Sequence, residues 1–262
     1  PSPVVMGGKG FGLYKYTRLG LPVPPWACLT ADVYHQPELW LRGGKKRPEL
    51  EEMVVNAILQ IESRTGKAFP FDLNRFEKTG RPDIAKKIRK ARMQSGVDTG
   101  KILFVSVRSG SYISMPGMLA TILNVPMNDD IAKRMIKSGM DPIFVLDLYR
   151  TFLANYGEAY GCINPTLFTD IIDDRKKLIA EANSTNFEDV TIKEFSIADY
   201  KHLIDAYKNI IQAHLPDINK QLDDPFDVLM NCIEAVFGSW NAATAVKYRK
   251  YQEISEHWGT AC

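Results

Sequence analysis

The chain has 262 residues, enough for one large or two small domains with a hydrophobic core. Apolar residues make up 45% and charged residues 24%, and the net charge of +2 excludes a strongly basic nucleic-acid-binding or membrane-surface protein. Four cysteines lie far apart without a CxxC pair, which argues against a zinc site and a disulfide scaffold. With no signal peptide and no apolar stretch of about 18 residues, the sequence predicts a soluble protein of the reducing cytoplasm.

Helical and strand patterns alternate in the first quarter of the chain. Leu13, Tyr16 and Leu19 recur about one helical turn apart, which predicts a helix over residues 9–19 that ends at Gly20. Residues 26–30 suit a short strand, and residues 48–64 suit an amphipathic helix.

The next segment carries the most apolar strand pattern. We expect a basic helix over residues 86–93, a turn over residues 96–100 and a buried strand over residues 102–107, which read Ile-Leu-Phe-Val-Ser-Val.

The pattern becomes helical after Asn128. Two apolar sets recur at helical spacing: Val145, Leu148, Phe152 and Tyr156, then Leu229, Ile233, Val236 and Trp240. Asp224 and Pro225 suit the start of the second helix, whereas residues 180–200 predict a helix interrupted by a loop. We therefore expect an α+β fold, in which residues 1–127 and 225–262 form an α/β lobe and residues 128–224 a helical insertion.

The first candidate site is the string Gly7-Gly8-Lys9-Gly10. Glycines leave backbone N–H groups accessible, the following helix offers its positive N-terminal end, and Lys9 adds a cation that can reach phosphate oxygens. Such short strings are common, and the alternative is a turn before a helix with a solvated lysine.

The second candidate site follows the strand predicted at residues 102–107. Arg108 stands at its carboxyl end, where open sheets present ligand-binding residues, and Ser109, Gly110 and Ser111 supply donors and a closely approaching backbone. The alternative is an arginine in a surface ion pair. The string Ser114-Met115-Pro116-Gly117-Met118 is interpreted as a turn with soft apolar packing.

Together these strings resemble the N-terminal nucleotide-binding domain of the pyruvate phosphate dikinase family. The similarity rests on GGKG and LGLPVPP, then SVRSG, SMPGM and TILN, then LYRTFLANYGEAYG, and finally VFGSWNAATAVKYRKYQEISEHWGTA, in the same order over nearly the whole chain. The Ser-Met-Pro-Gly-Met string separates it from the related phosphoenolpyruvate synthases and glucan dikinases.

The resemblance implies an ATP-grasp-like fold that holds ATP and Mg²⁺ between lobes. It makes Lys9 and Arg108 the phosphate-contacting cations, with Arg108 catalytic, and adds Gly8, Gly10, Ser109 and Gly110 to the binding residues. In this family, phosphate passes from ATP to a histidine on a swivelling domain, and from there to pyruvate.

Three segments depart from the family pattern. Leu119-Ala120-Thr121 stands where Met-Asp-Thr is usual, so Ala120 removes a carboxylate. Phe11-Gly12 replaces Ala-Asn, and Trp26 replaces a glycine. These changes concern substrate positioning and rate, and leave both cations in place.

The sequence also lacks segments that the family carries beyond Gly-Thr-Ala. We expect no metal ligands in this chain, since the third subdomain supplies the carboxylates that Mg²⁺ needs. Three interpretations remain: a subunit or fragment of a split dikinase, a non-catalytic nucleotide-binding or interaction module, and part of a longer enzyme. The first predicts a companion polypeptide with the missing lobe and phosphohistidine domain, or self-association, and little activity alone.

Overall fold

The computed structural model describes residues 1–216 and 222–262. The chain forms two compact units, Pro1–Thr121 with Leu229–Cys262, and Ile122–Val228. Helices dominate both units and the few strands are short, so the predicted α+β class is confirmed. Among the described residues, no helix is both long and apolar enough to cross a lipid bilayer.

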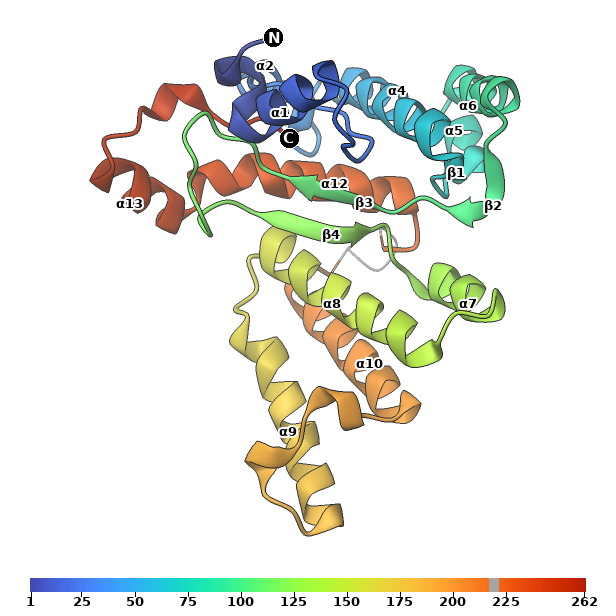
Figure 1. Ribbon diagram of the computed structural model, residues 1–262, viewed down its shortest axis with the longest axis vertical. Helices are drawn as coiled ribbons and strands as arrows, with labels where there is room; N and C mark the ends of the chain where they lie inside the picture. Colours follow the sequence, from blue (N-terminus) through green and yellow to red (C-terminus); the bar gives the residue numbers. More distant parts are fainter. Residues whose placement is uncertain (217–221) are drawn as a thin grey trace. The chain divides into compact units, whose positions relative to one another are not determined.

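The first unit contains six helices before its strand β3, in blue to green in Figure 1. In chain order its elements are α1 (Pro3–Arg18), α2 (Ala31–Tyr34), α3 (Pro37–Trp40), α4 (Arg47–Thr65), β1 (Lys67–Ala68), α5 (Leu73–Lys78), α6 (Pro82–Ser95), β2 (Asp98–Ile102), β3 (Val105–Arg108), and later the 3-10 turn η3 (Ser239–Asn241), α13 (Ala243–Tyr251) and the 3-10 turn η4 (Glu256–Trp258). Strand β4 (Thr121–Val125) and helix α12 (Pro225–Gly238) each contain residues of both units.

The strands form two small sheets, β1 with β2 and β3 with β4. β1 and β2 are parallel, so the chain needs a crossover between them, which α5 and α6 provide.

The sequence-based elements agree with the structure for the long helices and differ for the short segments. The helix predicted at residues 48–64 is α4, and the basic helix at residues 86–93 lies within α6. Of the turn predicted at residues 96–100, Gly96 is a left-handed turn residue, but the prediction is wrong from Asp98 on, where β2 begins. The strand predicted at residues 102–107 is divided between the end of β2 and β3, and residues 26–30 form no regular strand.

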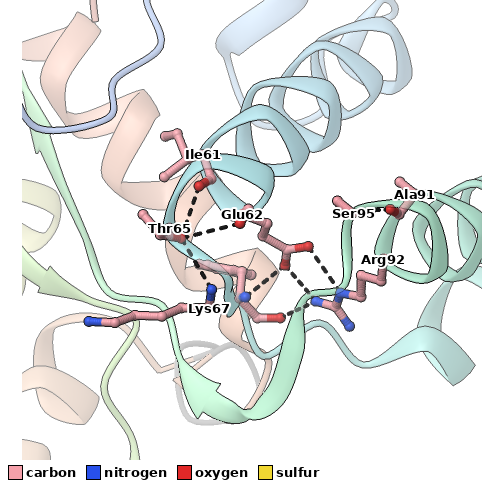
Figure 2. A network of polar contacts seen from close by, with 8 residues as sticks. Ile61, Glu62, Thr65, Lys67, Ala91, Arg92 and Ser95 are labelled. Atoms are coloured by element: carbon pink, nitrogen blue, oxygen red, sulfur yellow. Dashed lines mark hydrogen bonds and ion pairs between the residues drawn. The ribbon is translucent and has the colours of Figure 1, made fainter.

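A buried ion pair joins α4 to α6 in the first unit (Figure 2). Glu62 is 1% exposed, and its carboxylate accepts hydrogen bonds from the Phe69 N–H at 2.7 Å and from Arg92 Nε and Nη2 at 3.0 and 2.6 Å. Arg92 Nη2 also donates to the Phe69 carbonyl at 2.5 Å. Every oxygen of the buried carboxylate therefore has a charge-assisted partner, which offsets the free-energy cost of burying it.

Apolar residues of α4 and α12 form much of the core of the first unit. Leu50, Val54 and Ile58 of α4 are buried, as are all four positions of the second predicted helical set, Leu229, Ile233, Val236 and Trp240. Asp224 Oδ1 accepts the Phe226 N–H at 2.8 Å, so the predicted start of α12 at Asp224 and Pro225 is confirmed.

The second unit is helical. Its elements are α7 (Asp129–Lys137), α8 (Pro142–Gly161), α9 (Thr166–Asn183), the 3-10 turns η1 (Phe187–Asp189) and η2 (Ile192–Glu194), and α10 (Ile197–His214). Helices α8 and α10 lie side by side, and their buried residues form its core (Figure 1). The interruption predicted within residues 180–200 is present between α9 and α10, because the chain there forms only 3-10 turns.

Candidate functional site

The Gly7-Gly8-Lys9-Gly10 string lies inside α1, which is kinked at Gly7. Gly7 has φ +67°, so the helix is interrupted there and a second helical segment begins at Gly8. A Cβ at Gly7 would lie 1.8 Å from the Gly110 carbonyl oxygen. Only glycine permits this approach, so Gly7 is the residue that brings the two candidate strings together.

Backbone and side-chain hydrogen bonds join the two strings. The Gly8 N–H donates to the Ser111 carbonyl at 2.8 Å, and Lys9 Nζ donates to the Ser109 carbonyl at 3.1 Å. Residues about a hundred positions apart therefore form one local structure.

Strand β3 ends at Arg108 and leads into a buried turn. Ser109 is 3% exposed and its N–H donates to the Ala120 carbonyl at 3.4 Å, while Gly110 pairs with Ala261 in an antiparallel bridge. The Arg108 side chain is exposed, so its guanidinium is accessible beside Lys9. Its backbone is held in place by the neighbouring hydrogen bonds.

The electrostatics of this cluster favour an anion. Partial burial, and secondarily the positive charge of Arg108, lower the pKa of Lys9 below its ordinary value. Two cations held close together repel one another, and a polyphosphate between them would relieve that repulsion.

Both strings line one cavity of about 910 Å³ in the first unit. Gly8, Lys9, Gly10, Arg108, Ser109 and Gly110 form a polar cluster in its lining, here called the polar end, and most of the remaining lining residues are apolar, although Thr65, Lys67 and Ser106 also line the cavity. Cys28 lies against Gly10, where an added Cβ would meet its Sγ at 3.3 Å, and burial raises the pKa of this thiol to about 11. The cavity thus combines the cations of its polar end with lining residues that are mostly apolar.

The Ser114–Met118 string serves packing, as the sequence indicated. Met115 is 6% exposed in a cluster with Trp240, Ala245 and Ile254, and Met118 packs against this cluster. These contacts fix the position of the Ser114–Met118 string, which follows the turn after Arg108.

Sequence reasoning missed the role of two residues of this region. Gly7 belongs to the first candidate string, but only the fold shows that its backbone meets that of Gly110. Arg249, in a Tyr-Arg-Lys string that suggests a solvated helix face, is 2% exposed, stacks 4.2 Å from the Trp240 ring centroid and donates to the Trp240 carbonyl.

The described residues that line this cavity form no evident ligand set for Mg²⁺. None of the described residues that line it is an aspartate or glutamate. Across residues 1–216 and 222–262, no group of three or more His, Cys, Asp and Glu side chains could hold a metal ion. Mg²⁺ prefers carboxylate and phosphate oxygens, so the residues present do not fit it by themselves.

Comparison with known proteins connects this geometry to a family. Residues 4–262 match the pyruvate phosphate dikinase AMP/ATP-binding domain. Similar proteins include pyruvate, phosphate dikinase of Rhizobium meliloti (strain 1021), 31% identical, and of Clostridium symbiosum, 30% identical, each over 98% of this chain. Another is pyruvate, phosphate dikinase 1, chloroplastic, of Arabidopsis thaliana, 31% identical over 98% of this chain.

The chain spans 24%, 25% and 22% of the lengths of these three relatives. Its own match to the family covers nearly every residue, including both candidate strings. The chain therefore belongs to the pyruvate phosphate dikinase AMP/ATP-binding domain family and is an ATP-binding domain.

Proposed function

We propose that the polar end of the cavity binds the phosphates of ATP. The observation that carries this proposal is the hydrogen bond from Lys9 Nζ to the Ser109 carbonyl, since it holds the cation of the first string on the backbone of the second. Gly8, Gly10 and Gly110 leave backbone groups accessible beside that cation.

Each residue has a distinct role in this proposal. Lys9 exchanges the Ser109 carbonyl for a phosphate oxygen, a charged acceptor that makes a stronger hydrogen bond. Arg108 is the catalytic residue, because its planar guanidinium can hold two oxygens of the transferred phosphoryl group as negative charge develops there. Ser109 and Gly110 fix the backbone from which Arg108 extends.

We further propose that the whole protein acts as a pyruvate, phosphate dikinase like the relatives it matches, and that it transfers phosphate from ATP toward pyruvate. Mg²⁺ would neutralise phosphate charge there. Its protein ligands would come from residues outside the described part of this chain. The phosphohistidine domain and the remaining lobe come from a companion polypeptide, from self-association or from a longer form of the protein. A reducing cytoplasm suits the free thiols of Cys28, Cys162, Cys232 and Cys262.

Calorimetric titration of ATP tests the binding site. Arg108→Ala and Lys9→Ala should each weaken binding by about 1.5–3 kcal/mol, the range for hydrogen bonds to charged groups. Arg18→Ala and Lys15→Ala are matched controls, because both are exposed cations of α1 outside the cavity lining, and they should leave affinity nearly unchanged. If the chain alone binds too weakly, the same variants are titrated in the complex or longer form. Equal ATP binding by the Lys9, Arg108 and control variants would show that the site is placed wrongly.

A further inference from the structure

Arg249 of α13 is a buried cation whose charge is only partly compensated. Its side chain is 2% exposed, and its Nε atom has no hydrogen-bond partner among the described residues. Burial lowers the pKa of its guanidinium, and the charge of Glu256 offsets this effect only in part. Burying such a group costs free energy, so the stability of the fold does not by itself account for an arginine at this position.

The side-chain contacts of Arg249 are made with the 3-10 turn η3. The guanidinium lies 4.2 Å from the centroid of the Trp240 ring, and its Nη1 donates to the Trp240 carbonyl. A planar guanidinium that stacks on a ring and donates to the same residue permits few orientations of that residue. Arg249 therefore fixes both the ring and the backbone of Trp240 against α13.

Turn η3 holds the segment that joins β3 to β4 at two points. The ring of Trp240 belongs with Met115 to one buried apolar cluster. The neighbouring Ser239 hydroxyl accepts the Ala120 N–H at 3.1 Å. One apolar contact and one hydrogen bond thus connect η3 with this segment.

The same segment begins directly after Arg108. The Ser109 N–H donates to the Ala120 carbonyl at 3.4 Å, so Ala120 is bonded to η3 through its N–H and to Ser109 through its carbonyl. Within the described chain, the Arg108 guanidinium forms no hydrogen bond or ion pair of its own, so its position depends on the backbone beneath it. A displacement of η3 would therefore reach the end of β3 through two hydrogen bonds and one residue.

We propose that Arg249 is a positioning residue for the phosphate site, and that it acts through turn η3 on the backbone that carries Arg108. This inference rests on the proposed role of Arg108 toward ATP. Arg249 does not line the cavity, so it has no contact with the nucleotide in this proposal. A guanidinium that fixes η3 accounts for a buried cation that stability alone does not explain.

Calorimetric titration of ATP in two backgrounds tests this role. Arg249→Met, which removes the charge and the stack but keeps a long side chain, is introduced into the parent chain and into Arg108→Ala. It should weaken ATP binding about tenfold in the parent, because a displaced Arg108 loses its alignment with the phosphates. It should weaken binding less than about twofold in Arg108→Ala, because the group that it positions is already absent. Lys250→Met removes an exposed cation from the next position of α13, and this matched control should leave both affinities unchanged.

Ser239→Ala tests the same turn while the charge and the stack of Arg249 stay intact. It removes the acceptor of the Ala120 N–H and should weaken ATP binding at least about threefold, with the same dependence on Arg108. Ser239→Thr, which restores the hydroxyl, should recover the affinity. This pair of variants decides the question if Arg249→Met does not fold, and an unchanged affinity of Ser239→Ala would then overturn the proposal.

The two backgrounds separate positioning from general support of the fold. Equal losses from Arg249→Met with and without Arg108 would show that it stabilises the unit as a whole, and would overturn the positioning role. A folded Arg249→Met chain that binds ATP as tightly as the parent would overturn it too. Arg108→Ala alone identifies the other failure, since an unchanged affinity there contradicts the proposed nucleotide site itself. The titrations use the complex or longer form if the 262-residue chain binds ATP too weakly.

Discussion

At the level of single residues, the proposed site depends on the contact between Gly7 and Gly110 and on two cations, Lys9 and Arg108. Gly7, which has no Cβ, lets its backbone touch that of Gly110, and that contact places Lys9 on Ser109 beside Arg108. The chemistry assigned to the cations therefore depends on a steric requirement at a residue that makes no proposed contact with ATP.

Substitution of Gly7 should expose that requirement. Gly7→Ala adds a Cβ that would lie 1.8 Å from the Gly110 oxygen, at a φ of +67° that alanine rarely adopts. We expect a loss of at least about 2 kcal/mol in the free energy of unfolding, measured by denaturant titration. Gly20→Ala is the control, because Gly20 has φ +71° but nothing within 4 Å, and it should cost only about 1 kcal/mol. Equal losses would show that the contact with Gly110 is unimportant.

The lowered pKa of Lys9 predicts a dependence on pH. Partial burial, and then Arg108, favour the neutral amine, so the lysine loses its proton below the ordinary value of 10.5. ATP affinity should therefore decrease as the pH rises through this lowered pKa, and Lys9→Arg should keep its affinity to higher pH because a guanidinium stays charged.

The stability of the free chain should change in the opposite direction. Its folded state binds the Lys9 proton less tightly than its unfolded state, so this residue raises stability as the pH increases between the lowered pKa and 10.5. ATP titrations and unfolding curves at several pH values check both signs. A Lys9-dependent affinity that stays flat across this interval would contradict the assigned environment.

At the scale of elements, the long periodic patterns predicted the structure best. Leu229, Ile233 and Val236 of α12, which recur at helical spacing, are buried, because a one-sided apolar face is satisfied by packing, whereas Met53 on the expected apolar face of α4 is 42% exposed. The resemblance to the family placed both candidate strings in one nucleotide site. The structure shows the hydrogen bonds that join them.

Short segments were predicted less well because their conformation depends on partners. The apolar run at residues 102–107 does not reveal that the strand breaks at Leu103 and Phe104. Residues 26–30 have strand-forming composition, yet only Leu29 among them has strand-type pairing in the described chain. A strand needs a neighbour at its edge, and no local pattern names that neighbour.

The buried ion pair between α4 and α6 gives a prediction at this scale. Glu62→Ala leaves Arg92 and the Phe69 N–H without their acceptor, and should cost about 3–5 kcal/mol of unfolding free energy in thermal or denaturant unfolding. Glu77→Ala removes the exposed partner of Arg89, a 2.9 Å pair, and should cost about 0–1 kcal/mol. Similar losses in both variants would show that the network of Figure 2 adds little.

For the whole molecule, charge is distributed unevenly between the units. Lysine and arginine outnumber acidic residues in the first unit, and acidic residues outnumber basic ones in the second, although the net charge is only +2. The unit that holds the candidate site is therefore the one whose field attracts a polyanion.

The 262-residue chain should hydrolyse ATP slowly. The described residues that line its cavity include cations but no carboxylates to position a metal, and phosphoryl transfer depends on a held metal ion. We expect turnover with Mg²⁺ well below about 1 per second, the lower end for kinases. A coupled assay at saturating ATP measures it, with Arg108→Ala to identify contaminating activity. Faster turnover that Arg108→Ala abolishes would contradict the incomplete site.

In the proposed site, Lys9 and Arg108 act on the phosphates of one ATP molecule. A double-mutant cycle tests it most directly: ATP binding is measured for the parent chain, Lys9→Ala, Arg108→Ala and the double variant, in the complex or longer form if the chain alone binds weakly. The coupling free energy should be at least about 0.5 kcal/mol, because the two cations share a ligand and a neighbouring backbone. Additive losses, or affinities that neither substitution changes, would contradict it.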